Sequence, residues 1–363
     1  MGIKYLNKHL QSSCSNSIKH ISLSELSGKK IVIDTSIYLY RFLGEHALLE
    51  NFYLMISIFR EHNIIPLFIF DGKPPKEKDD LLKQRKDGKR VAETKYNELK
   101  NSIDDVSEYE KKHLESSMLA LQKEFIRLRH TDIENVKLLI QAYGVSYIEA
   151  PGEADKLCAK MVCKHKAYAC LSEDMDLFVY GCHRVLRYLS LLKKKVVIYD
   201  LKGILTDMKM SFDEFQSICV VSGTDYNIDM ENNTNLTQTL KHFKKYKQLL
   251  SNQSTNQSND NDNDNDNDND NKNKKYKKNK NKNKNKNKTR AENIITNISF
   301  YEWLEKHTKY ITNSMELYNI QDMFDLTKMT EYKQYEKINI VNGPVHKPNL
   351  INILKLENFL FVE

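Results

Sequence analysis

Apolar residues in the first half of the chain follow two alternating patterns. Continuous apolar runs predict strands that are buried on both faces, and they lie at 29–33, 64–70, 146–148 and 167–171. Helical spacing of apolar residues predicts helices at 37–42, 52–59, 133–142 and 154–162. Strands that alternate with helices indicate an α/β fold with a central, mostly parallel, twisted sheet flanked by helices. Weaker patterns add strands at 185–189 and 195–199 and a helix at 211–221.

Residues 76–135 differ from this core because they are highly charged and almost free of Gly and Pro. They predict helices, with basic residues crowded into the first part. Such helices are usually a solvated surface hairpin. The alternative is an arch of basic helices that grips phosphates over the core, and composition alone favours neither.

The pattern weakens after residue 226. One more helix is predicted within 227–251, and residues 252–290 are an Asn-Asp and then Asn-Lys repeat that we expect to be disordered. Helical spacing resumes in 291–363, which we expect to pack back on the core as a C-terminal extension. The chain therefore divides into a core at 1–226 and these three additions.

Acidic residues follow the predicted strands. Asp34 and Asp71 each close an apolar run, and Asp174 and Asp176 come just after another. Parallel strands bring their carboxyl ends to one edge of a sheet, so we expect these acids to cluster. A lone acid at a strand end is usually a turn former or a helix cap. Three strands that each end in an acid are a stronger signal.

A second pair, Glu153 and Asp155, opens the helix that precedes Asp174 and Asp176. Asp225 follows a later helix at a glycine. Carboxylates that are gathered together repel one another unless a cation lies among them, and oxygen donors favour Mg²⁺ or Mn²⁺ over zinc. Taken alone, each pair is more often an ordinary pair of solvated acids. Because the two pairs flank one predicted buried helix and strand, we weight a metal site and solvated acids equally.

Composition adds little to this picture. The formal charge is +7, but eleven basic and six acidic residues fall between Asp260 and Arg290, so most of the excess is local. The six cysteines form no C-x-x-C pair, which predicts buried thiols in a reduced, intracellular protein. Neither a membrane span nor a secretion signal is apparent.

The order of the motifs, MGI, IVID, FDGKPP, APGEAD, SEDMD and GTDY, resembles the flap endonuclease (Rad2/XPG-type 5′-nuclease) family over roughly residues 1–226. The resemblance implies a PIN-like nuclease core with a helical arch at about 76–135. It also implies a structure-specific nuclease that cleaves DNA at 5′ flaps and at nicked or gapped junctions. The cofactor it implies is a pair of Mg²⁺ ions, which Mn²⁺ can replace.

The same resemblance assigns roles to individual residues. It implies that seven carboxylates bind the metal ions: Asp34, Asp71, Glu153, Asp155, Asp174, Asp176 and Asp225. It implies catalytic roles for Asp174, for Lys78 and for Arg85, the last two contacting the scissile phosphate. Gly2 and Tyr40 match further substrate-binding positions, with Tyr40 stacking on a base.

The chain departs from the family pattern in three places. Asp155 stands where the family usually has Glu. The region after GTDY reads NIDMENNTNLTQTLKHF and lacks the glycine-rich turn of the helix–hairpin–helix that anchors duplex DNA, so 227–251 is a degenerate form of it. Finally, no sliding-clamp-binding box is found near the end, so we expect no clamp partner.

The leading hypothesis is thus a Mg²⁺-dependent 5′-flap endonuclease and 5′→3′ exonuclease in DNA replication, repair or recombination. We expect a monomer that acts in the nucleus or in a cytoplasmic replication compartment. An RNA endonuclease that degrades messenger RNA is the second hypothesis. A non-catalytic DNA-binding scaffold is the third, and the acids argue against it because a binder of phosphates gains nothing from negative charge.

Overall fold

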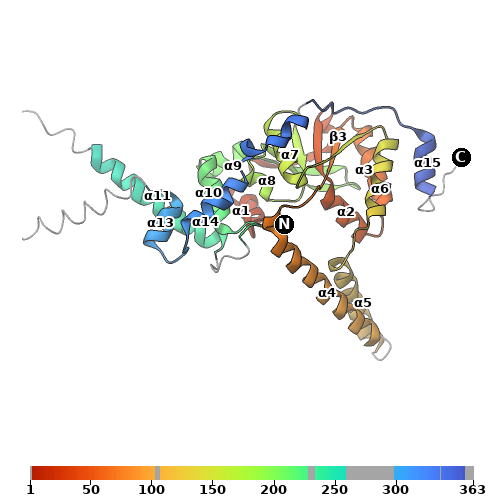
Figure 1. The fold of residues 1–363 in the computed structure, drawn as a ribbon, viewed down its shortest axis with the longest axis horizontal. Helices are drawn as coiled ribbons and strands as arrows, with labels where there is room; N and C mark the ends of the chain where they lie inside the picture. Colours follow the sequence, from red (N-terminus) through yellow and green to blue (C-terminus); the bar gives the residue numbers. More distant parts are fainter. Residues whose placement is uncertain (1, 103–106, 228–233, 259–297, 336, 356–363) are drawn as a thin grey trace, which may run out of the picture.

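The computed structural model describes residues 2–102, 107–227, 234–258, 298–335 and 337–355 (Figure 1). Its centre is a seven-stranded sheet in the order β1-β7-β6-β5-β2-β3-β4. The predicted strands are present as β2 (Lys30–Asp34), β3 (Ile65–Phe70), β4 (Ser146–Glu149), β5 (Ala169–Leu171), β6 (Arg184–Ser190) and β7 (Lys195–Asp200). Strands β6, β5, β2, β3 and β4 run parallel, whereas β7 is antiparallel to β6. The predicted α/β fold with a mostly parallel sheet is confirmed.

One strand, β1, and two short helices, α8 (Asp176–Val179) and α9, were not predicted. Strand β1 (Ile18–Ser22) pairs antiparallel with β7. Its side chains are exposed or half-buried because it is an edge strand, so the apolar run that marks a buried strand is missing. Helix α9 (Leu201–Met208) follows β7. Asp200 caps its N-terminus, because the Asp200 side chain accepts a hydrogen bond from the Gly203 amide.

Helices cover both faces of the sheet. On one face lie α2 (Thr35–Gly44), α3 (Leu48–Glu61) and α6 (His130–Ala142), and on the other lie α1 (Leu6–Ser13), α7 (Ala154–Cys163), α8 (Asp176–Val179) and α10 (Phe212–Ser222). Successive residues of a strand point to opposite faces, so Val32 joins one core and Ile31 and Ile33 join the other. All six cysteines are free thiols, and all except Cys163 are buried.

The charged segment forms a two-helix projection from the core (Figure 1). A short 3₁₀ turn, η2 (Lys76–Lys78), leads into α4 (Asp79–Ser102), which pairs with α5 (Glu108–Glu124). Ala92 is the only residue of α4 that is buried. Helices with so little buried surface are stabilised mainly by their own turns and by each other.

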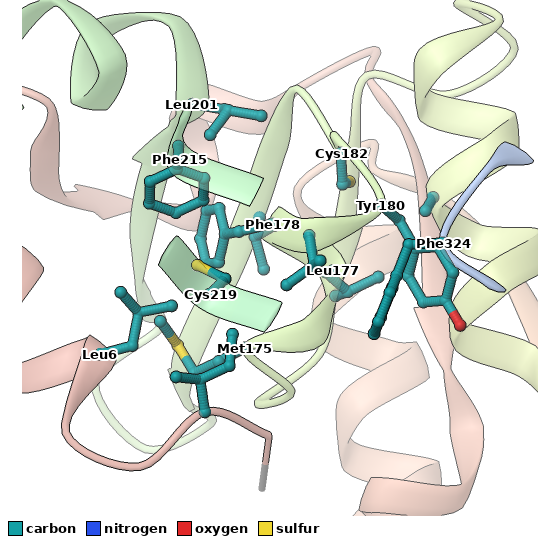
Figure 2. Packing of buried hydrophobic residues seen from close by; sticks show 14 of the residues in the cluster. Leu6, Met175, Leu177, Phe178, Tyr180, Cys182, Leu201, Phe215, Cys219 and Phe324 are labelled. Carbon is teal, nitrogen blue, oxygen red and sulfur yellow. The ribbon is translucent and has the colours of Figure 1, made fainter. Parts of the chain in front are cut away.

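The C-terminal part returns to the core at two places. Helices α11 (Leu236–Ser258), α13 (Phe300–His307) and α14 (Ser314–Met323) lie beside α10, and the 3₁₀ turns η5 (Leu326–Lys328) and η6 (Thr330–Tyr335) follow. Helix α15 (Lys347–Lys355) packs on α6 at the far end of the molecule (Figure 1). Phe324 is buried against Tyr180, with ring centroids 4.8 Å apart (Figure 2). The extension is therefore part of the hydrophobic core around α8.

Helix α11 continues to Ser258, beyond the point where the polar repeat begins. No Gly or Pro stops it there, and extending an existing helix costs little compared with starting one. The remainder of the repeat, residues 228–233 of the degenerate DNA-binding region and residues 356–363 lie outside the described residues. Within the described part, no helix combines the length and the apolar character needed to cross a bilayer.

Candidate active site

The predicted acids stand at the carboxyl edge of the parallel strands. Asp34 is the last residue of β2 and Asp71 follows β3, while Glu153 precedes α7 after β4. Asp174 and Asp176 follow β5, and Asp176 is the first residue of α8. The parallel register of β5, β2, β3 and β4 brings these strand ends to one edge.

Hydrogen bonds join neighbouring strand ends. The Ser172 hydroxyl donates to Asp34 Oδ2 at 2.9 Å and accepts from the Asp174 amide at 3.1 Å. The Ala154 amide donates to Asp71 Oδ1 at 2.8 Å, which ties the end of β3 to the start of α7. Ser172 was not predicted as a site residue, although its place directly before the acid pair is a usable signal.

Glycines allow two close approaches at this edge. A Cβ atom on Gly72 would lie 2.0 Å from the Ala150 carbonyl oxygen, so the loops that carry Asp71 and Glu153 can meet only with glycine there. Gly2 has a φ of +71°, and a Cβ on it would lie 2.5 Å from Asp176 Oδ1 and 2.7 Å from Asp174 Oδ1. The start of the described chain therefore lies against this acid pair.

The carboxylates influence one another electrostatically. Burial, followed by the charge of Asp71, raises the pKa of Asp34 to about 8. Burial also raises the pKa of Asp155, of Asp174 and of Asp176, with further contributions from Glu153, Asp225 and Asp174 respectively. Each of the seven acids thus takes part in at least one of these charge interactions, and several of the pairs join distant parts of the sequence.

Two cations from the base of the projection lie among the acids. Lys78 is 7% exposed, and its Nζ atom lies 2.6 Å from Glu153 Oε1 and 3.9 Å from Asp225 Oδ2. Arg85 Nη2 lies 2.9 Å from Asp225 Oδ2. Burial alone lowers the pKa of Lys78, but the surrounding carboxylates, Asp155 foremost, more than compensate and raise it.

Tyr226 was not predicted as a site residue, although it ends the GTDY motif. Its hydroxyl donates to Glu153 Oε2 at 2.9 Å, and Lys78 Nζ lies 4.7 Å from the centre of its ring. Phe324 packs edge-on against the same ring at 5.4 Å. Tyr226 therefore fixes the orientation of Glu153 and is itself supported by the C-terminal extension.

Tyr40 has a different environment from the acids. It is 46% exposed on α2, and Lys89 Nζ of α4 lies 5.0 Å from the centre of its ring. The Lys89 ammonium also donates to the Ile126 carbonyl at 3.0 Å. Tyr40 thus lies at the root of the projection, with an aromatic face that is partly open to solvent.

The residues at this edge fit a hard cation by their chemistry. All the donors are carboxylate oxygens, and burial and mutual repulsion raise the pKa of four of them, Asp34, Asp155, Asp174 and Asp176. Asp176 Oδ1 is buried and has no hydrogen-bond partner in the described part of the chain. Among the described residues, however, no three Asp, Glu, His or Cys side chains are close enough together to enclose a metal ion. Some of these side chains would therefore have to move for the carboxylates to hold an ion.

Two family models match this chain, the XPG N-terminal domain over residues 1–92 and the XPG I-region over residues 144–225. Between them they contain every predicted acid and both basic residues. The chain belongs to the XPG/Rad2 family of 5′-nucleases. The predicted family is confirmed, and the projection falls largely between the two matched regions.

Curated relatives agree with this assignment. Flap endonuclease 1 of Leishmania braziliensis is 31% identical over 248 residues, which cover 62% of this chain and 60% of that protein. Flap endonuclease 1 of Methanocaldococcus jannaschii is 32% identical over 228 residues, covering 57% and 65% respectively. The chain thus matches less than two thirds of the length of these relatives.

Solved structures support the fold. The catalytic core of Rad2 (complex I) superposes with a TM-score of 0.58 at 16% identity, covering 99% of this chain and 95% of that one. The catalytic core of Rad2 in complex with DNA substrate (complex III) gives a TM-score of 0.59 at 16% identity, covering 98% and 95%. At this identity the likeness concerns the architecture alone.

Proposed function

We propose that this chain is a Mg²⁺-dependent, structure-specific nuclease that cleaves DNA at 5′ flaps. We further propose 5′→3′ exonuclease activity at nicks and gaps, in DNA replication, repair or recombination. The observation that carries the proposal is the meeting of acids from four strand ends and one helix end with Lys78 and Arg85 from the projection. The names of the curated relatives support the choice of a flap substrate.

Phosphodiester hydrolysis requires an activated water molecule and a stabilised leaving oxygen, and a pair of Mg²⁺ or Mn²⁺ ions supplies both kinds of chemistry when bound. Asp34, Asp71, Glu153, Asp155, Asp174, Asp176 and Asp225 are the residues that would hold them. Asp155 is one methylene shorter than Glu, so its carboxylate reaches less far toward them. Tyr226 would keep Glu153 in place through its hydroxyl hydrogen bond.

Lys78 and Arg85 would act on the phosphate. Both side chains start from the base of α4, and both now neutralise carboxylates. Their ammonium and guanidinium groups would neutralise the scissile phosphate, whose negative charge grows in the transition state. Gly2 would leave Asp174 and Asp176 accessible to the DNA strand, because it carries no side chain. Tyr40 offers an aromatic face on which a base can stack.

A substrate panel with Mg²⁺ tests the proposal, using a 5′ flap, a nick, a gap, a bubble and a single-stranded RNA of matched length. We expect cleavage of the flap to be the fastest. We expect Asp174→Asn to lower kcat by more than about 100-fold while DNA binding is retained, because the substitution removes one anionic oxygen donor but keeps the shape. Asp213→Asn, at an exposed position on α10, is the matched control.

Three outcomes would overturn parts of this proposal. Substantial cleavage by Asp174→Asn would contradict the role of that carboxylate. Faster cleavage of RNA than of any DNA junction would favour the messenger-RNA endonuclease. A complete lack of cleavage with Mg²⁺ or Mn²⁺, with DNA binding intact, would leave only the scaffold.

A further inference from the structure

A cavity adjoins the candidate active site. It has a volume of about 320 Å³, and Glu153 and Tyr226 form the wall that it shares with the acids. Its other walls come from the loop after β3, from the loop and first turn of α7, and from residues 323–331 of the C-terminal extension. Whatever lies in this cavity lies next to Glu153.

The walls suit one nucleotide. Pro75 and Pro151 offer flat apolar surfaces, and Met323 and Met329 add polarizable thioethers, which contact aromatic rings favourably. The volume lies at the lower end of the range of small-ligand sites, so it fits a base with its sugar and is too small for a duplex.

The charged groups around the cavity match the polar parts of a nucleotide. Lys73 is exposed and Lys156 is half-buried, and within the described chain neither forms an ion pair, in contrast to Lys78. Both can therefore contact a phosphate without breaking an existing interaction. Glu77 and Glu331 also line the cavity, and their carboxylates can accept hydrogen bonds from the exocyclic amine of a base.

We propose that this cavity is a subsite for a single nucleotide of the cleaved strand, adjoining the scissile phosphate. The proposal rests on the nuclease function proposed above. Met323, Met329 and Glu331 lie outside the regions that match the family models, so this wall is contributed by the chain's own C-terminal extension. The base packs between the methionines and prolines, while Lys73 and Lys156 hold its phosphate.

A scan with abasic sites tests the subsite through binding rather than cleavage. A labelled 5′-flap DNA is prepared as a series in which one nucleotide near the junction at a time lacks its base. Affinity for the full chain is measured by fluorescence anisotropy in EDTA, where the DNA stays intact. We expect one position to weaken binding about tenfold and its neighbours to have little effect, as for the loss of one buried base.

Met323→Ala removes one wall of the cavity. We expect it to weaken binding of intact DNA, but to remove the penalty of the abasic site at the sensitive position, because the base no longer has a surface to contact. Met315→Ala is the matched control, since Met315 is 65% exposed on the same helix and does not line the cavity. Melting curves check that both variants fold.

Lys73→Ala supplies a second measurement that does not depend on packing. Affinity falls as the salt concentration rises, and we expect the steepness of log affinity against log salt concentration to decrease by about one. This is the change for one lost phosphate contact. Lys202→Ala, at an exposed lysine outside this cavity, should leave the slope unchanged.

The outcomes separate this proposal from the proposed function. A flat abasic scan, or a penalty that persists in Met323→Ala, overturns the subsite even if the protein cleaves flaps. A single sensitive position that depends on Met323, in a protein that cleaves no substrate, keeps the subsite for a DNA strand and refutes the nuclease.

Discussion

At the scale of single residues, the site is dominated by the cost of holding carboxylates together. Asp34 is 6% exposed, and it lies within the electrostatic influence of Asp71, Asp174 and Glu153. Ser172 and Lys78 offset part of this cost through a hydrogen bond and through charge. The remaining repulsion is what a divalent cation would relieve.

Burial of Asp34, together with this repulsion, predicts how stability depends on pH in metal-free protein. The folded-state pKa of Asp34 is about 8, against 3.8 as its ordinary value, so the folded state holds a proton that the unfolded state has released between those pH values. Stability should therefore fall as the pH rises from about 4 to 8. Melting temperatures in EDTA across this range measure the effect.

Asp34→Asn isolates the contribution of this one carboxyl group, because the amide stays neutral at every pH. We expect its melting temperature to fall less steeply with pH than that of the wild type, and Asp213→Asn to follow the wild type. Added Mg²⁺ should stabilise the wild type more at pH 8 than at pH 5. Parallel wild-type and Asp34→Asn curves would show that Asp34 is ionised in both states.

At the scale of elements, the base of α4 is attached to the acids through Lys78 and Arg85. Lys78 occupies the space among Glu153, Asp225 and the Tyr226 ring, where it serves as an internal cation. Because two cations cannot share one set of carboxylates at full strength, binding of a divalent ion should compete with Lys78.

We therefore predict that Lys78→Met binds divalent ions more tightly than the wild type, by about three- to tenfold, while flap cleavage falls. The range corresponds to about 0.7 to 1.4 kcal/mol gained by removing one competing ion pair, in which the Lys78 side chain is 9% and the Glu153 side chain 20% exposed. Isothermal titration calorimetry with Mg²⁺ in the absence of DNA measures it. Lys83→Met, one turn further along α4 at a side chain that is 74% exposed, is the control. Unchanged or weaker binding by Lys78→Met would mean that Lys78 helps to hold the ions instead.

At the scale of the whole molecule, the C-terminal extension completes the core next to the site. Phe324 is 2% exposed and packs against Tyr180 (Figure 2). It also contacts Tyr226, so one ring joins the core around α8 to the residue that orients Glu153. Helix α15 closes the opposite end against α6. The extension thus contributes packing to both faces of the sheet.

Phe324→Ala should lower the free energy of unfolding by about 3 to 5 kcal/mol, because it removes a buried ring and leaves a cavity. Met315→Ala, at an exposed position on α14, should change it by less than about 0.5 kcal/mol. Urea unfolding followed by circular dichroism compares the two. A similar small effect for both variants would mean that the extension packs only loosely on the core.

The sequence by itself determined the parallel strands, the helices between them and the acids that close the strands. Apolar periodicity and strand-end position are local properties, and parallel strands share an edge whatever the rest of the chain does. Strand β1 and the short helices α8 and α9 could not be predicted, since an edge strand lacks a continuous apolar run and a short helix lacks a clear period.

Only the tertiary structure decided which distant residues meet. Nothing in the sequence pattern indicates that Phe324 packs on Tyr226 or that the Tyr226 hydroxyl donates to Glu153. The pattern predicts Lys78 as a phosphate contact, but in the fold its side chain also lies among the acids. Such contacts join residues far apart in the chain, and they depend on packing and charge in three dimensions. Local patterns carry no information about either.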